Sequence, residues 1–102
     1  MAETLSWQAE EDTLVLRGEL DRVTLLPFWE QREQALQGIR FLDVSRLDRV
    51  DSAGVALMLH LCALQARRGG TLMLTGVTDK LRTLITLYNL HNILPCADDS
   101  PG

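Results

Sequence analysis

The sequence predicts a small α/β domain with a four-stranded mixed sheet in the order β-β-α-β-α-β-α, its helices packed mainly on one face. Three observations support this prediction. The first twenty residues alternate apolar and polar side chains twice, as two neighbouring strands do. Downstream, strand patterns alternate with helical patterns, which favours right-handed crossovers and parallel strands. The chain has 102 residues, of which 46% are apolar, so one domain with one core is expected.

The amino-terminal elements are a hairpin and a helix. Residues 5–9 and 13–20 alternate and are joined by an acidic turn, which predicts two antiparallel strands. A helix is expected over residues 25–37, with Thr24 as its N-cap and Gly38 as its stop.

The remainder of the chain alternates between strands and helices, each bounded by turn or capping residues. The expected elements are, in chain order, a strand over residues 39–44, a charged loop over 45–51, a helix over 53–67, a strand over 71–75 and a helix that begins near Thr78 and ends at Asn89.

The chain is expected to consist of one domain over residues 1–96 and a flexible polar tail over residues 97–102. Its longest near-apolar stretch, residues 55–64, has about half the ~20 residues that span a bilayer, and its first seven residues do not resemble a signal peptide. The net charge of −4 disfavours nucleic acid as a partner. We therefore expect a cytoplasmic protein that does not insert into membranes.

The most informative segment is Asp51-Ser52-Ala53-Gly54, where a loop becomes a helix. The Ser52 hydroxyl can cap the helix, and Asp51 places negative charge near the positive end of the helix dipole. Ala53 and Gly54 are small, which leaves room for another backbone or a partner to approach closely. A capping serine, a phosphorylated serine and a docking site are all compatible with these residues.

The helix behind this turn is more apolar than packing on a sheet requires. Val55 and Met58 belong to the stripe expected to face the sheet, whereas Leu57 and Leu61 fall on a second stripe. Two interpretations follow. Either neighbouring helices cover the second stripe, or its leucines surround His60 on a surface that binds a partner.

The run Asp43-Val-Ser-Arg-Leu-Asp-Arg-Val-Asp-Ser-Ala-Gly, a strand end followed by a D-S-x-G turn, resembles the STAS domain family. Leu26-Pro-Phe-Trp-Glu and Leu87-Tyr-Asn-Leu are similar to the STAS subunits of bacterial phospholipid ABC transporters. This resemblance, over about residues 4–95, implies a STAS-like fold. It also implies a non-enzymatic accessory subunit that binds the transporter's ATPase subunit, and through it the membrane permease, in traffic that keeps the outer membrane asymmetric.

The resemblance also implies where the partner binds. In the transporter subunits the turn and the following helix are the docking surface, which corresponds here to Asp51, Ser52, Ala53, Gly54, Leu57, His60 and Leu61. In STAS anti-sigma factor antagonists, a partner kinase phosphorylates the residue that corresponds to Ser52. Ala53 stands where those antagonists usually have a second hydroxyl residue. A transporter subunit, peripheral to the inner membrane through its partner, is therefore the first hypothesis and a phospho-switch the alternative.

The sequence contains no pattern of an enzyme, cofactor or metal site. Ser52 and His60 lie on one predicted helix about 12 Å apart, too far for proton transfer between them. Cys62 and Cys96 share no metal-ligand spacing with the histidines. We therefore expect no catalytic residue, no cofactor and no metal.

Overall fold

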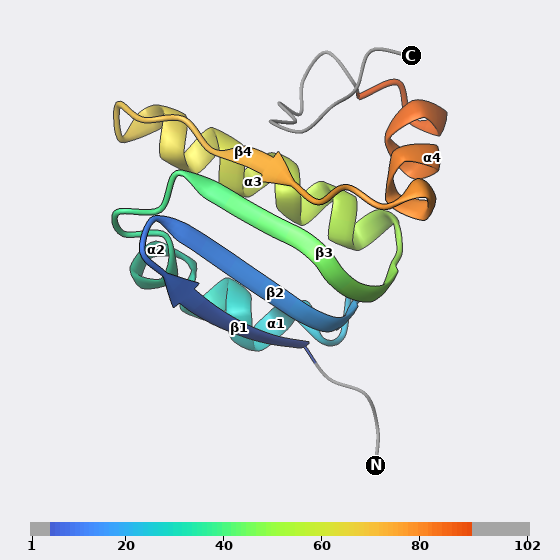
Figure 1. Cartoon of the computed structure of the whole chain (residues 1–102), viewed down its shortest axis with the longest axis horizontal. Coiled ribbons are helices and arrows are strands. Elements are labelled where there is room, and N and C mark those ends of the chain that lie inside the picture. Colours follow the sequence, from blue (N-terminus) through green and yellow to red (C-terminus); the bar gives the residue numbers. More distant parts are fainter. Residues whose placement is uncertain (1–4, 91–102) are drawn as a thin grey trace.

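The computed structural model describes residues 5–90 and has the predicted α/β architecture (Figure 1). Four strands form a single sheet in the order β1-β2-β3-β4. The strands are β1 (Leu5–Glu10), β2 (Thr13–Leu20), β3 (Phe41–Val50) and β4 (Met73–Thr75). β1 pairs with β2 antiparallel, whereas β2 with β3 and β3 with β4 are parallel, so the sheet is mixed as predicted. The predicted tail and Cys96 lie outside the described residues.

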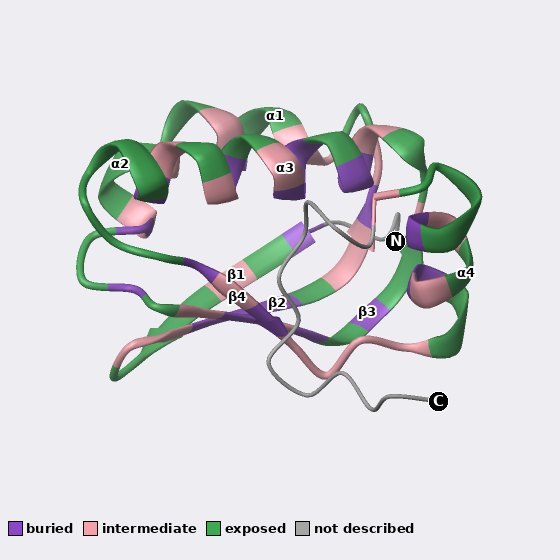
Figure 2. Cartoon of the chain, turned by 90° about the horizontal axis from the view of Figure 1, so that it is seen from above, coloured by how far each residue is buried: buried purple, intermediate pink, exposed green. Residues whose placement is uncertain are grey.

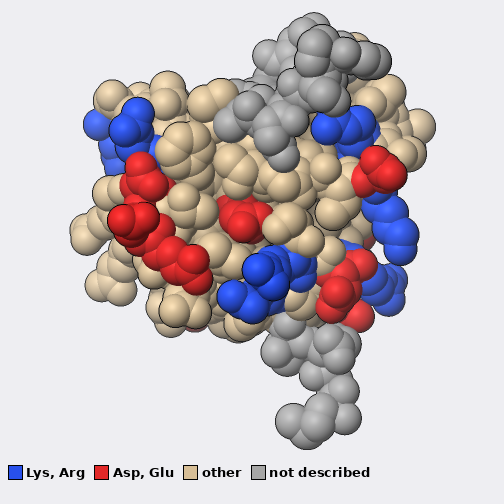
Figure 3. Space-filling model, in the orientation of Figure 1, with Lys and Arg blue, Asp and Glu red and all other residues tan. Residues whose placement is uncertain are grey.

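The helices cover one face of the sheet and one of its ends (Figure 2). They are α1 (Leu25–Glu30), α2 (Arg32–Ala35), α3 (Ser52–Arg67) and α4 (Asp79–Leu87). The first three lie on the same face, and α4 lies beside the sheet end where α3 begins. None of the described helices covers the other face, where groups of Lys and Arg side chains lie among groups of Asp and Glu (Figure 3).

The third strand is longer than the sequence predicts. β3 continues to Val50, and the residues expected as a charged loop pair with β2, Arg46 opposite Arg17. The register shifts twice along this stretch, so the inward-facing Val44 is followed by Leu47 rather than by residue 46. Such a bulge interrupts the alternation of apolar and polar residues. The prediction of a loop was wrong because it rested on the charged side chains of these residues, whereas backbone pairing with β2 makes them part of the strand.

Asp21 organises the turn that precedes α1. The Asp21 Oδ1 accepts hydrogen bonds from the N–H groups of Val23 at 2.8 Å and Thr24 at 2.9 Å. These bonds, the Thr24 N–H above all, hold the pKa of Asp21 below its ordinary value of 3.8. Thr24 already has helical dihedral angles, and its hydroxyl donates to the Glu19 carbonyl instead. Thr24 therefore occupies the N-cap position as predicted, but its side chain makes no capping hydrogen bond.

The helix expected over residues 25–37 is divided at Gln31 into α1 and α2. The Gln31 N–H donates to the Phe28 carbonyl in a tight turn, and the Arg32 Nη1 donates to the Trp29 carbonyl at 2.6 Å. The last carbonyls of a helix have no partner within it. Arg32 therefore stabilises the break by satisfying one of them.

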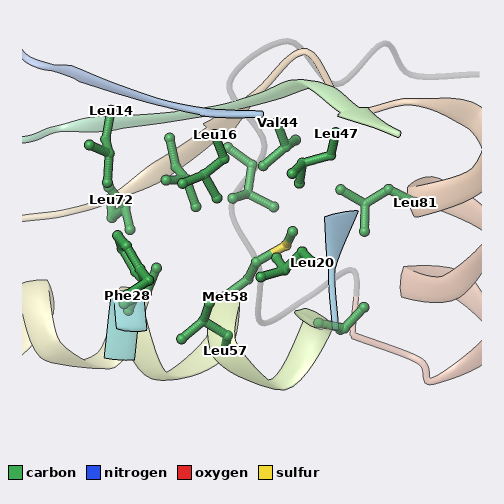
Figure 4. Close-up of a cluster of buried hydrophobic side chains, with 14 of the residues drawn as sticks. Leu14, Leu16, Leu20, Phe28, Val44, Leu47, Leu57, Met58, Leu72 and Leu81 are labelled. Carbon is green, nitrogen blue, oxygen red and sulfur yellow. The ribbon is translucent and has the colours of Figure 1, made fainter. Parts of the chain in front are cut away.

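The core fills the space between the inner face of the sheet and α1–α3 (Figure 4). Phe28, fully buried, meets the Trp7 ring from β1 edge-on, with 5.0 Å between the ring centroids. The labelled core side chains come from the sheet, from the segment just before β4, and from α1, α3 and α4: Leu14, Leu16, Leu20, Phe28, Val44, Leu47, Leu57, Met58, Leu72 and Leu81.

Among the described residues, one polar residue, Gln65, is buried. Its Nε2 donates to the carbonyls of Leu36 at 2.9 Å and Ile39 at 2.7 Å, and its Oε1 accepts from Arg68 at 3.2 Å. Gln65 therefore fastens the end of α3 to the connection between α2 and β3.

The last described elements agree with the sequence except in the length of the strand. β4 is shorter than expected, whereas α4 begins and ends where predicted. The Thr78 Oγ1 accepts from the Leu81 N–H at 3.2 Å, and Asn89 follows the helix with a φ of 58°. Both are the expected capping arrangements.

Candidate functional site

Asp51 caps the turn into α3. Its Oδ1 accepts a hydrogen bond from the Gly54 N–H at 3.1 Å, and its own N–H donates to the Leu20 carbonyl at 3.2 Å. Ser52 is the first residue of α3 and is exposed, so the expectation that its hydroxyl caps the helix was wrong. The reason is that β3 continues to Val50, which places the non-helical capping position at residue 51.

Gly54 allows a close approach, but toward the domain's own core. A Cβ at this position would lie 2.8 Å from Val50 Cγ1, 2.9 Å from Leu20 Cγ and 3.0 Å from the Leu20 carbonyl oxygen. The start of α3 therefore rests directly on the ends of β2 and β3. Because Gly54 is buried, it does not itself offer a contact to a partner. Ala53, which is half-buried, is the small residue of the turn that remains accessible.

Leu57 and Leu61 are buried, with exposed fractions of 2% and 0%. The expectation that they form an exposed surface around His60 was therefore wrong. The alternative, that a neighbouring helix covers the second leucine stripe, is confirmed. α1 lies beside this part of α3, where the Trp29 and His60 rings meet edge-on with 5.4 Å between their centroids.

An apolar groove lies between α1 and the exposed side of α3, and we call it the α1–α3 groove. Its volume is about 280 Å³, and it is lined by Leu25, Leu26, Trp29, Ala53, Ala56, Leu57 and His60. Leu26 is 56% exposed and the nearby Val23 is 68% exposed. The apolar surface at the start of α1 is therefore larger than the groove itself.

Trp29 forms a fixed wall of the α1–α3 groove. The Arg32 guanidinium carbon lies 3.9 Å from the centroid of the Trp29 ring, and the Arg32 Nη1 donates to the Trp29 carbonyl. The His60 ring contacts the Trp29 ring edge-on. The attraction between a cation and a tryptophan face holds one side of the ring, so Trp29 is fixed between Arg32 of α2 and His60 of α3.

The structure brings together three of the predicted site residues, Ala53, Leu57 and His60, at the α1–α3 groove. Asp51 and Ser52 precede it at the helix start, whereas Gly54 and Leu61 belong to the core. The sequence interpretation missed Ala56, although its spacing from Ala53 and His60 places all three on one helix face. It also missed Leu26 and Trp29, whose position opposite α3 depends on the tertiary fold.

The described residues hold no group of three or more His, Cys, Asp or Glu side chains that is placed to bind a metal ion. Within residues 5–90, every helix is too short or too polar to cross a lipid bilayer. The α1–α3 groove offers apolar contact with His60 as its polar lining residue, and the exposed Ser52 precedes it at the start of α3, which suits the recognition of a partner.

The chain is similar to known proteins over most of its length. A chain from Escherichia coli K12, the intermembrane phospholipid transport system binding protein MlaB, is 52% identical over 96 residues, which cover 93% of this chain and 99% of that one. The protein of the same name from Haemophilus influenzae is 33% identical over 98 residues, which cover 86% and 93% of the two chains.

Among solved structures, the anti-sigma factor antagonist SpoIIAA in its unphosphorylated form superposes with a TM-score of 0.64. Its sequence identity is 22%, and the match covers 98% of this chain and 90% of SpoIIAA, which establishes the shared fold. The family described as Mlab, STAS domain, matches residues 3–95. The chain therefore belongs to the Mlab, STAS domain family.

Proposed function

We propose that the chain is the binding subunit of an intermembrane phospholipid transport system and that it docks on the ATPase subunit of that ABC transporter. The name of the Escherichia coli relative, which matches over 96 residues at 52% identity, supports the first part. A binding subunit contributes contacts and no reaction, so it requires no catalytic residue. In this arrangement the partner holds the chain at the cytoplasmic side of the inner membrane.

The docking surface of this proposal begins at Asp51 and Ser52 and continues along α3 through Ala53 and His60. The observation that carries it is the α1–α3 groove, whose apolar lining is open beside the exposed start of α3. Apolar surface that is rimmed by polar residues and left open on a small domain is typical of protein interfaces.

The test is a pair of substitutions at Ser52 with a control on the same helix. We expect Ser52→Arg to abolish co-purification with the cognate ATPase subunit, because an arginine at this exposed position obstructs the contact. Ser52→Ala removes no needed volume and no helix cap, so it should bind normally. Ala66→Arg, at the exposed far end of α3, is the control. Normal binding by Ser52→Arg, with an unchanged melting temperature, would place the interface elsewhere.

The same variants distinguish docking from a phospho-switch at the exposed Ser52. In a phospho-switch, Ser52→Ala locks the partner-bound state and Ser52→Asp releases the partner. In the docking proposal, Ser52→Ala is silent and Ser52→Asp is weakened, because it adds a second negative charge beside Asp51. Mass spectrometry of the protein purified from its host shows whether Ser52 carries a phosphate.

A further inference from the structure

A cavity lies at the end of α3 away from Ser52, and we call it the arginine cavity. It is lined by residues 36–40, which connect α2 to β3, by residues 68–71, which follow α3, and by Gln65. The two connections lie side by side at the end of the sheet opposite α4, because β3 and β4 pair from their first residues (Figure 1). The volume of about 720 Å³ is within the roughly 300–1,000 Å³ of pockets that hold small molecules.

The lining of the arginine cavity is positively charged. Arg40 and Arg68 come from its two sides, and none of its ten lining residues is Asp or Glu. Within residues 5–90, neither guanidinium forms an ion pair with a carboxylate. The chain as a whole carries a net charge of −4, so the cavity has the opposite sign from the molecule. A local charge of this kind attracts an anion.

The carboxyl end of α3 also borders the arginine cavity, and a helix end of this kind carries only about half a negative charge. The carbonyls of residues 64–66 accept hydrogen bonds from the N–H groups of residues 68–70. Two full positive charges therefore outweigh the helix end, and the lining remains positive.

Arg68 is oriented before any ligand binds. Its Nη1 donates to the Gln65 Oε1 at 3.2 Å, and its Nη2 donates to the Glu33 carbonyl at 3.0 Å. The buried Gln65 is itself fixed by its hydrogen bonds to the carbonyls of Leu36 and Ile39. Both acceptors of Arg68 are uncharged, so its positive charge is not neutralised, and its other N–H groups remain for a ligand.

We propose that the arginine cavity binds a phosphate group, which Arg68 and Arg40 hold from two sides. A planar guanidinium matches the phosphate oxygens with two parallel N–H bonds and stays charged at physiological pH. Gln37 and Thr71 add uncharged polar side chains to the lining. Soluble phosphate esters and phospholipid head groups both carry such a group. The site is separate from the surface around Ser52, so it does not depend on the proposed function.

The test is a titration of the full chain at constant ionic strength, followed by the backbone amide signals in NMR spectra. We expect millimolar glycerol 3-phosphate and inorganic phosphate to shift the signals of Gly38, Gly69 and Thr71, whereas sodium chloride at the same ionic strength does not. Arg40→Gln should weaken this binding by about fivefold or more, and Arg68→Gln by about tenfold or more.

Arg67→Gln is the matched control, since it removes the same charge from the last turn of α3 outside the cavity. Its affinity should stay within about twofold of the original chain. Arg68→Lys keeps the charge but loses the planar fork, so it should retain only part of the affinity. Arg68→Gln also loses the bonds to Gln65 and Glu33, so the melting temperature of each variant is measured. Arg40→Gln, at an exposed position, should melt like the original chain and tests the site independently.

Vesicles distinguish the two sources of the phosphate group. The full chain is sedimented with vesicles of phosphatidylcholine, alone and with added phosphatidylglycerol. Binding to the second kind only, with its loss in Arg40→Gln, identifies a lipid head group. A response to glycerol 3-phosphate without vesicle binding identifies a soluble ester. The site is refuted if neither the phosphate probes nor the vesicles bind, or if Arg40→Gln and Arg68→Gln weaken binding no more than Arg67→Gln does.

Discussion

Gly54→Ala tests how closely α3 packs on the sheet. The added methyl group would lie 2.8 Å from Val50 Cγ1 and 3.0 Å from the Leu20 carbonyl oxygen. The third contact, at 2.9 Å, is with Leu20 Cγ, a branching atom near the backbone of a fully buried side chain. None of these atoms is the mobile end of a long side chain, so the helix start must move away from β2 and β3.

The expected cost is the balance of two effects. Overpacking of a tight core costs about 1–3 kcal/mol, and the contacts of 3.0 Å or less at Gly54 place the cost in the upper part of that range, about 2–3 kcal/mol. Alanine is favoured over glycine inside a helix by about 1 kcal/mol, which offsets part of that cost. We therefore expect a net loss of about 1–2 kcal/mol in the free energy of unfolding. For a domain of this size, the melting temperature should fall by about 4–10 °C.

The assay is thermal and urea unfolding followed by circular dichroism, with Gly70→Ala as the matched control. At Gly70 the nearest atom to an added Cβ is the Gln65 carbonyl oxygen at 3.7 Å, an ordinary contact. That variant should remain within about 0.5 kcal/mol of the original chain. If Gly54→Ala is as stable as Gly70→Ala, the close contact between α3 and the strand ends is refuted.

Three further predictions follow from the described contacts. Asp51→Ala should lose about 1 kcal/mol in the free energy of unfolding by urea, whereas Ser52→Ala should change it little. A larger loss for Ser52→Ala than for Asp51→Ala would show that Ser52 caps the helix. Gln65→Leu leaves the carbonyls of Leu36 and Ile39 without their side-chain donor, so about 2–3 kcal/mol should be lost in the same assay; unchanged stability would contradict the buried bonds. The folded pKa of Asp21 is depressed, so its stabilisation is present above the ordinary value of 3.8 and disappears as pH falls through the folded pKa. The gap in melting temperature between the original chain and Asp21→Asn should therefore close on acidification, and a gap that persists at pH 2 would argue against this origin.

The sequence alone determined the elements whose evidence is local. Alternation predicted β1 and β2, because adjacent side chains of a strand point to opposite faces. Thr78 and Asn89 marked the ends of α4, since a cap bonds to residues within a turn of it. The D-S-x-G turn at the start of α3 was visible for the same reason, together with the family it resembles.

The tertiary structure decided the features that depend on distant partners. The charged residues 45–50 became strand because backbone N–H and C=O groups pair with β2 whatever the side chains are. Gln65 is buried because carbonyls 26 and 29 residues away satisfy it. Neither feature can be predicted from the pattern of apolar and polar residues in the neighbouring sequence.

The candidate site combines both kinds of information. The sequence showed that α3 carries more apolar residues than one packing face requires. It did not decide whether Leu57 and Leu61 are covered by a neighbouring helix or exposed on a binding surface. The position of α1 decided between them, burying both leucines and leaving Ala53, Ala56 and His60 beside Trp29. Periodicity records which residues share a face of one helix, whereas exposure depends on the neighbour that packs there. That neighbour is fixed by contacts between segments far apart in the chain.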